Sequence, residues 1–287
     1  MTPSQLELPR IAAVDAFSAQ PLAGNGATVV LLQQPAAATW MQALAAELNQ
    51  SETAFLWRDG LQWRLRWFTP SCEVPLCGHA TLAAAVALEH WGELACGTPG
   101  ELHSRSGALE VMVEAPGLGS IVLPAGELLP RQAEPWMDST LPAPALKQWT
   151  SALGYGVLLL EADADLGRLD PDDPAWASGP EVGWVVMQAA AEPHHYQLRF
   201  FAPGLGLRED PVTGSAHALV APWWCESLQL ERVHGWQPSQ RPGGLWATPL
   251  DSAMIRLQGE AVLLWNGHLQ HAPPSIDLDS WRRCAPC

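Results

Sequence analysis

The chain has 287 residues, of which 48% are hydrophobic and 16% charged, a composition typical of a globular protein with room for two domains of roughly 100–150 residues each. Thirty acidic residues against fifteen lysines and arginines give a formal net charge of -15, which argues against nucleic acid as a partner because phosphate contacts need clustered basic groups. No apolar run reaches the roughly 18 residues of a membrane helix, and the first residues lack a signal-peptide pattern, so we expect a cytoplasmic protein that does not bind membranes.

The first half of the chain reads as strands that alternate with two helices. Three segments have strand composition, namely 11–18 (IAAVDAFS), 28–32 (TVVLL) and 54–57 (AFLW). An amphipathic pattern predicts a helix over 40–49 (WMQALAAELN). The run ATLAAAVALEHW at 80–91 is rich in alanine and leucine, which favour helix.

A segment rich in proline and glycine, residues 116–146, suits a linker that carries a strand or two. After it, 183–189 (GWVVMQA) reads as a buried strand, and 215–224 (SAHALVAPWW) reads as a helix that Pro222 cuts short. The stretch 260–270 (EAVLLWNGHLQ) reads as a hairpin, with Asn266 and Gly267 at its turn.

The two halves repeat one pattern. Residues 63–70 (WRLRWFTP) resemble residues 196–203 (YQLRFFAP), and each is a strand that ends at a proline. EVPLCGHAT follows the first copy and EDPVTGSAH the second, so that Glu73 matches Glu209. Two linked matches in the same order predict two similar α+β halves.

Each copy of the repeat leads into a helix whose first residues are small or polar. A helix N-terminus presents unpaired backbone N–H groups and a partial positive charge. Two such starts, at Gly78–His79 and Gly214–Ser215, would face each other across a cleft and hold a carboxylate without a basic side chain. Taken singly, each start fits an ordinary helix cap better than a binding site, and it is the repeat that favours a site.

Two acidic residues accompany these helix starts. Asp210 precedes the second start, and Glu52 follows the first predicted helix in the stretch NQSETAF. A carboxylate in a dry pocket has its pKa raised toward neutrality, which suits a group that moves protons. The alternative for Glu52 is a solvated residue at the start of a strand.

Three motifs spread over the chain closely resemble those of the phenazine-biosynthesis PhzF-like family. They are NQSETAF (49–55), FTPSCEVPLCGHAT (68–81) and EDPVTGSAH (209–217). The opening VDAFS…PLAGN (14–25) and the late RLQGEAVLLWNGHL also resemble this family. The motif forms CGHAT and DPVTGSAH resemble a broader branch with unassigned substrates rather than the phenazine-pathway members, and the family's late Arg-Gly-Gly stretch is interrupted here, as Arg241–Gly244.

The resemblance implies an α+β, diaminopimelate-epimerase-like fold of two pseudo-symmetric domains. Each would be a curved, mostly antiparallel sheet or barrel wrapped around a central helix. We expect residues 1–115 with 275–287 to form the N-terminal half and residues 116–274 the C-terminal half, with the active site in a cleft between them. The family also implies a homodimer that acts on a small carboxylate substrate with no metal or organic cofactor.

Residue roles carry over by motif. The resemblance implies that Glu52 is the general acid/base that lifts a proton from one carbon and returns it to another, and that His79 and Asp210 steer protonation and hold polar groups of the substrate. It also implies that the substrate carboxylate is bound at the helix starts by Gly78, Gly214 and Ser215. The sequence therefore predicts an isomerase.

Two other functions are compatible with the pattern. A two-thiol racemase or epimerase would place one cysteine at each helix start. Cys77 holds one such position, but the matching position is Thr213, so that half of the machinery is missing. A non-catalytic protein that keeps the site to bind a small carboxylate or a protein partner is the third reading, and it would tolerate Glu52→Gln without any change in activity.

Overall fold

The computed structural model describes residues 8–132, 140–250 and 253–274. The chain divides into two compact units. Unit 1 contains Gly26–Ile121 together with the chain up to Leu22 and the chain from Glu260 onward, and unit 2 contains Ala23–Asn25 and Val122–Gly259. In the described part of the chain, no helix is both long and apolar enough to span a membrane.

These bounds differ from the predicted halves in three places, the shortest being Ala23–Asn25, which belongs to unit 2. Residues 116–121 belong to unit 1 because the strand that contains them pairs with its neighbour there. Residues 260–274 belong to unit 1 as well, since the last strand of the fold pairs antiparallel with the first. Residues 275–287 lie outside the described residues, and the cleft and the homodimer stay predictions.

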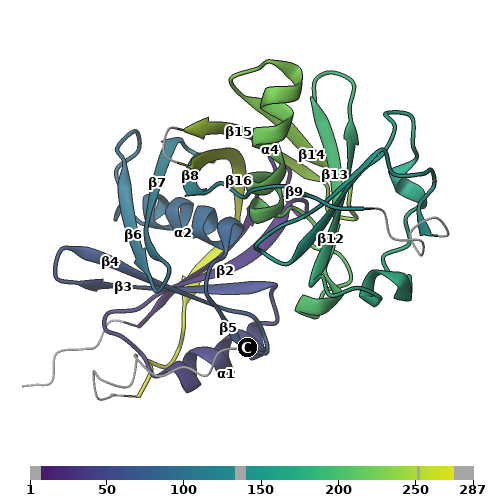
Figure 1. Cartoon of the computed structure of the whole chain (residues 1–287). Helices are drawn as coiled ribbons and strands as arrows, with labels where there is room; N and C mark the ends of the chain where they lie inside the picture. The colour runs from purple at the N-terminus through teal and green to yellow at the C-terminus, as the bar shows by residue number, and fades with distance from the viewer. Residues whose placement is uncertain (1–7, 133–139, 251–252, 275–287) are drawn as a thin grey trace, which may run out of the picture. The chain divides into compact units, whose positions relative to one another are not determined.

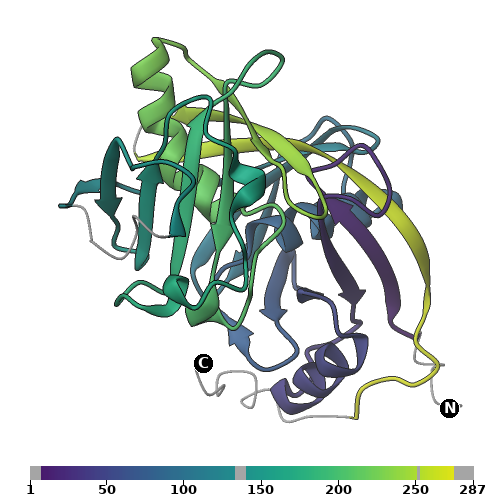
Figure 2. The ribbon, with the colours of Figure 1, turned by 90° about the vertical axis from the view of Figure 1, so that its right-hand side faces the viewer.

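Unit 1 is a closed barrel of eight strands (Figure 1). Its strands follow one another in the order β1 (Arg10–Ala16), β2 (Asn25–Leu31), β3 (Glu52–Asp59), β4 (Gln62–Phe68), β6 (Gly100–Ser104), β7 (Gly107–Ala115), β8 (Leu118–Pro124) and β16 (Met254–His268). The short strand β5 (Glu73–Val74) pairs with β4. The barrel closes because β16 lies antiparallel along β1, which Figure 2 shows as a yellow strand beside a purple one.

Helix α2 (Gly78–His90) is the centre of this barrel. Every residue from His79 to Leu88 is buried, and the helix contacts β1, β3 and β7. A helix that is apolar on all sides needs to be enclosed, and its many alanines allow the surrounding strands to approach closely. Helix α1 (Ala38–Leu48) instead packs one face, with Met41 and Ala45 buried, against β3 and β4.

Unit 2 is a curved sheet with helix α4 (Gly214–Leu228) against it. The strands are β9 (Leu129–Pro130), β10 (Lys147–Thr150), β11 (Tyr155–Leu159), β12 (Gly183–Ala189), β13 (Tyr196–Phe201), β14 (Val233–Gln237), β15 (Gly243–Leu250) and the first part of β16. Three short 3-10 helices connect them, at Leu166–Arg168, Pro174–Ala177 and Pro203–Leu205.

Strand pairing confirms the internal repeat. In unit 1, β2–β3 is parallel, β3–β4 antiparallel, β4–β6 parallel and β6–β7 antiparallel. In unit 2, the successive pairs from β11 to β15 follow the same alternation. Each unit also places its long helix between the equivalent strands, after β4 and after β13. The predicted α+β fold of two pseudo-symmetric parts is confirmed.

A buried arginine–glutamate pair occurs at the same place in each unit. Arg66 on β4 binds Glu73 through two hydrogen bonds of 2.7 and 2.9 Å, and Arg199 on β13 binds Glu209 through two of 2.7 Å. Each guanidinium also lies over the phenylalanine two positions further along its strand. The repeated glutamate is therefore structural, because it ties the loop before each helix to the preceding strand.

The structure corrects two expectations. Helix α4 does not stop at Pro222 but continues to Leu228. The carbonyl of Ala218, which a proline four residues later leaves without its helical partner, accepts a hydrogen bond of 3.3 Å from the N–H of Gly126. The expected hairpin at Asn266 and Gly267 is absent, because both residues belong to the uninterrupted strand β16 and pair with β1.

Gly126→Ala is expected to destabilise the protein by about 1–3 kcal/mol, since an added methyl group would lie 2.5 Å from Cδ1 and 3.1 Å from Cα of Leu219. Urea denaturation followed by circular dichroism measures the change. Gly267→Ala is the matched control, because a Cβ there meets nothing within 4 Å, and we expect a change within about 0.5 kcal/mol. Equal effects for the two variants would contradict the close packing at Gly126.

Arg199→Met is expected to cost about 3–5 kcal/mol, because it leaves the buried Glu209 carboxylate without its cation. The double variant Arg199→Met/Glu209→Leu should recover part of this loss, since no isolated charge remains. Arg64→Met is the control, because its ion pair with Asp59 is exposed and is worth at most about 1 kcal/mol. Denaturation midpoints of the four proteins provide the comparison.

Candidate active site

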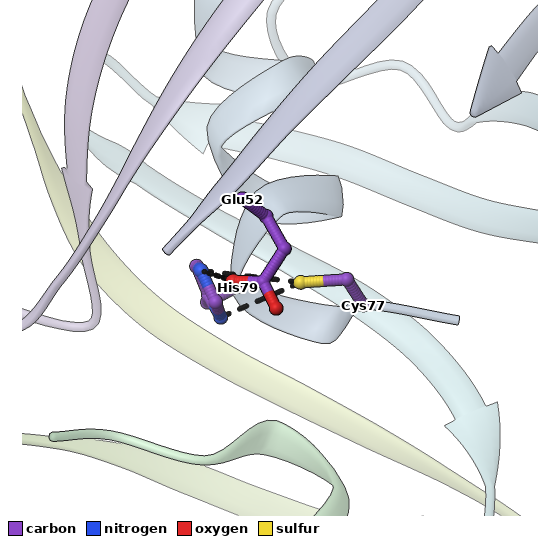
Figure 3. Close-up of side chains that lie close together, drawn as sticks. All are labelled: Glu52, Cys77 and His79. Carbon is purple, nitrogen blue, oxygen red and sulfur yellow. Dashed lines mark hydrogen bonds and ion pairs between the residues drawn. The ribbon is translucent and has the colours of Figure 1, made fainter. Parts of the chain in front are cut away.

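Three side chains from two elements of unit 1 meet at one point, Glu52, Cys77 and His79 (Figure 3). Helix α1 ends at Asn49, which adopts a left-handed backbone conformation, and the chain turns directly into β3. Glu52 is the first residue of β3 and pairs with Ala27 of β2. Cys77 is the residue before α2, and His79 lies in the first turn of α2. The start of a strand and the start of the central helix thus converge.

The distances within this cluster are those of direct contacts. Nε2 of His79 lies 3.0 Å from Oε2 of Glu52 and 3.2 Å from Oγ of Ser51. Sγ of Cys77 lies 3.5 Å from Nδ1 of the same imidazole. Ser51 is held in turn by the hydrogen bond that it donates to the carbonyl of Gly26, at 2.7 Å. The imidazole of His79 is therefore fixed in orientation by three side chains.

Glu52 and His79 form a buried ion pair. Burial alone raises the pKa of Glu52, but the charge of His79 and the contacts from His79, Ser51 and Cys77 lower it more, and the net pKa is below 4.5. For His79, burial alone lowers the pKa, but Cys77 and the Glu52 carboxylate raise it more, to well above 6.5. The expectation that Glu52 has a raised pKa is wrong for the free protein, because the sequence did not show the adjacent cation.

Burial, with the Glu52 charge as a second cause, raises the pKa of the Cys77 thiol to about 11. The thiol is 7% exposed and therefore keeps its proton at neutral pH. The thiolate is the nucleophilic and basic form of cysteine, so Cys77 is a poor base in this environment.

The N-terminus of α2 is not capped. The Cys77 side chain contacts the imidazole of His79 but makes no capping hydrogen bond, and the N–H groups of Gly78 and His79 have no acceptor among the described residues. Free N–H groups and the helix dipole favour an anion at such a start. The predicted position of the helix start is confirmed, and an oxyanion next to Glu52 would find donors there.

The start of α4 in unit 2 is also not capped, for a different reason. The hydroxyl of Thr213, the residue before the helix, donates a 2.5 Å hydrogen bond to Oδ2 of Asp210 instead of accepting one from the helix. The N–H groups of Gly214 and Ser215 have no acceptor within the described part of the chain. The second predicted helix start is confirmed as well.

Asp210 is enclosed by donors. Besides the Thr213 hydroxyl on Oδ2, Asn25 donates to Oδ1 at 2.8 Å, and Gln237 donates to the backbone carbonyl of Asp210 at 3.1 Å. Arg241 anchors the Asn25 segment, because its guanidinium donates to the carbonyls of Gly24 and Ala23. The interrupted arginine–glycine stretch therefore serves the same network.

Ser215 lies at the open end of α4. Its hydroxyl is 3.2 Å from the hydroxyl of Tyr155, whose ring packs on Phe200 at 4.7 Å between centroids. Two hydroxyl groups and the free N–H groups of the first turn thus share one place in unit 2.

Unit 1 brings together three of the six predicted site residues, Glu52, Gly78 and His79, and unit 2 holds the other three, Asp210, Gly214 and Ser215. Their catalytic and binding roles stay predictions. Sequence reasoning assigned no role to Asn25, Ser51 or Tyr155. Asn25 and Ser51 lie inside the PLAGN and NQSETAF motifs, and this was the only sequence feature that could have marked them as site residues. Tyr155 lies in no motif, and only the structure reveals it.

One group in the described residues offers metal-ligand atoms close together. Oε of Glu52, Sγ of Cys77 and an imidazole nitrogen of His79 all lie within 4.8 Å of one another. The sequence predicts no metal and no organic cofactor for the reaction.

Comparison with solved structures identifies the class of protein to which this fold belongs. A solved structure of a PhzF-family phenazine biosynthesis protein from Enterococcus faecalis superposes with a TM-score of 0.85, at 29% identity over 92% of this chain and 100% of that one. The two repeated units, each built on a central helix, thus have the diaminopimelate-epimerase-like architecture of that class.

The family follows from the sequence comparison. The profile of the family described as phenazine biosynthesis-like protein matches residues 14–127 and 131–267. An uncharacterized isomerase of Pseudomonas aeruginosa is 40% identical over 90% of this chain and 97% of its own length, and one of Halalkalibacterium halodurans is 33% identical over 89% and 96%. The chain belongs to the phenazine biosynthesis-like (PhzF) family, and these relatives support an isomerase or epimerase kind of activity.

The ion pair predicts an unusual titration of His79. Its imidazole should titrate well above 6.5, and Glu52→Gln should lower that pKa by removing the carboxylate charge. NMR titration of the imidazole protons measures the pKa of His79 in the native protein and in the Glu52→Gln variant. Glu47→Gln, at an exposed carboxylate of α1, is the control and should leave the titration unchanged. A pKa for His79 near 6.5 in the native protein would contradict the ion pair.

The pKa shifts of His79 and Glu52 determine the pH range in which their ion pair stabilises the folded protein. Because the pKa of His79 is raised on folding, its contribution to stability is complete below 6.5 and is lost as pH rises through the raised value. Because the pKa of Glu52 is lowered on folding, its contribution is present above 4.5 and is lost as pH falls through the lowered value.

Proposed function

We propose that this protein is a cofactor-independent isomerase that moves a proton between two carbons of a small carboxylate-bearing substrate, with Glu52 as the general acid/base. The observation that carries the proposal is the buried 3.0 Å ion pair between Glu52 and His79 beside the uncapped N-terminus of α2. The Glu52 carboxylate is a proton acceptor, and it lies beside the first turn of α2, which provides the His79 cation and the free backbone N–H donors.

The proposed reaction has two proton transfers. Glu52, ionised in the free protein, accepts a proton from a carbon whose electron pair is delocalised toward the substrate carboxylate. Donors at Gly78 and the His79 cation stabilise the negative charge that develops there. Protonated Glu52 then returns the proton to a different carbon, and the double bond moves.

The lowered pKa of Glu52 affects the two transfers in opposite ways. A carboxylate with a low pKa is a weak base, so proton removal is the slower transfer, whereas its acid form readily gives the proton back. Burial of the substrate in the site would desolvate Glu52 further and raise its pKa toward a value better matched to proton removal.

We assign the α4 start a binding role. Gly214 and Ser215 offer backbone donors, and Ser215 with Tyr155 offers hydroxyls for a polar group of the substrate. Asp210 is better supported as a positioning residue than as a proton carrier, because both of its oxygens already accept hydrogen bonds, from Asn25 and Thr213.

The two alternatives receive less support. A two-thiol racemase needs a second base at Thr213, whose hydroxyl is committed to Asp210, and needs an ionised Cys77, whose pKa is about 11. A non-catalytic carboxylate-binding protein would need the helix starts but has no use for a buried ion pair.

The test is proton exchange in D₂O followed by NMR, with a panel of β,γ-unsaturated and cyclic amino or hydroxy carboxylates. The native protein should place deuterium on a substrate carbon or shift a double bond for at least one compound. Glu52→Gln should lower that rate by about 10²–10⁴-fold, because it removes the acid/base and changes little in shape.

Glu47→Gln is the control for the loss of one carboxylate, and circular dichroism checks that each variant is folded. Exchange that persists undiminished in Glu52→Gln would overturn the role of Glu52. The binding-protein reading would instead be supported by compounds that bind, seen as line broadening, and show no exchange at all.

A further inference from the structure

We infer that Glu52, Cys77 and His79 form a binding site for a borderline-soft divalent transition-metal ion such as Zn²⁺, and that the bound ion inhibits the protein. The site would be tetrahedral, with one carboxylate, one thiolate and one imidazole ligand and a fourth position open to solvent or Ser51. The inhibitory part of this inference rests on the proposed function of Glu52, whereas the binding part does not.

The ligand set is of the kind that zinc prefers. Structural and catalytic zinc ions are held by thiolate, imidazole and carboxylate groups, and three protein ligands with an open fourth position are common. Here one residue of each type reaches the same point, from the start of β3 and the start of α2 (Figure 3). The cluster is mixed and buried, unlike the exposed groups of acidic residues that are frequent on protein surfaces.

The distances fit such an ion. Ligands at about 2.0 Å for nitrogen and oxygen and about 2.3 Å for sulfur, in a tetrahedron, lie about 3.3 Å (N to O) and about 3.5 Å (N to S) from one another. Nε2 of His79 is 3.0 Å from Oε2 of Glu52 and 3.9 Å from Sγ of Cys77. The first distance needs to lengthen by about 0.3 Å and the second to shorten by about 0.4 Å, within the reach of small side-chain rotations.

An independent observation concerns Oε2 of Glu52. This atom is fully buried, and its contact is the imidazole of His79, whose Nε2 lies 3.0 Å away without the alignment of a hydrogen bond. A buried carboxylate oxygen is stable only beside a cation or a donor, and here the imidazolium fills that place in the free protein. A cation at the centre of the cluster would satisfy this oxygen.

Binding is balanced by the release of protons. Metal-bound cysteine and histidine are deprotonated, so the ion would displace the thiol proton of Cys77 and one imidazole proton of His79 into solvent. The lone pairs of Glu52 that would accept a substrate proton are then donated to the metal. The ion consequently blocks proton transfer.

The experiment uses Co²⁺ as a spectroscopic probe for the full-length protein in the absence of substrate. Thiolate ligation gives an intense near-ultraviolet charge-transfer band, and tetrahedral geometry gives visible d–d bands. We expect both bands, and we expect added Zn²⁺ to abolish them by displacement.

Cys77→Ser should lose the charge-transfer band and remain folded, because serine is a good residue before a helix. One control should keep the band. Cys96→Ser removes an exposed free thiol and leaves the cluster intact. Glu52→Gln should weaken Co²⁺ binding at least about tenfold, and it serves as the second variant if Cys77→Ser does not fold.

Absence of the band from the native protein, or its persistence in Cys77→Ser, would refute the site. Exchange assays with a chelator present and with Zn²⁺ added then test the inhibition, and activity that rises with Zn²⁺ would contradict it. Failure of Co²⁺ binding with intact exchange rejects this inference alone. Intact Co²⁺ binding with no exchange in the substrate panel counts against the proposed function alone.

Discussion

The structure depends on a buried arginine–glutamate pair that occurs once in each unit. Each arginine is on the strand before the long helix, and each glutamate is in the segment between that strand and the helix, Glu73 at the start of the short strand β5. Two parallel hydrogen bonds fix both the distance and the direction of this loop, which a single contact would not do. The helix start is thereby held still relative to the strands, and an uncapped first turn can keep its N–H groups free for a ligand.

Much of the fold follows from sequence because the pattern was repeated. The match between WRLRWFTP and YQLRFFAP, with the glutamate and glycine that follow, contains the arginine, the glutamate and the first residue of each helix. The sequence pattern alone did not predict the features that depend on contacts between residues distant in the chain. Pro222 looks like a helix end until Gly126 supplies a donor for the freed carbonyl, and Asn266–Gly267 looks like a turn until β1 lies beside it.

The candidate site shows the same division. The motifs identify Glu52 and His79 as residues of interest, but the sign of the pKa shift of Glu52 depends on the 3.0 Å separation between them, which no spacing in sequence encodes. Likewise, EDPVTGSAH presents two adjacent acids with no visible difference. Glu209 forms an ion pair with Arg199, whereas Asp210 accepts hydrogen bonds from Thr213 and Asn25, a difference that the motif does not show. Tyr155, outside every motif, was beyond the reach of sequence reasoning.

The duplicated design also bears on how such proteins change over evolution. The arginine–glutamate anchor and the first glycine of the helix are the same in both copies, whereas the residues on either side of that glycine differ, Cys77 and His79 in one copy and Thr213 and Ser215 in the other. The backbone supplies the anion-binding N–H groups whatever these side chains are, so substitutions there alter chemistry with little penalty in folding. The side chains at these positions can therefore differ between the two units while the anchoring ion pair and the backbone donors stay the same.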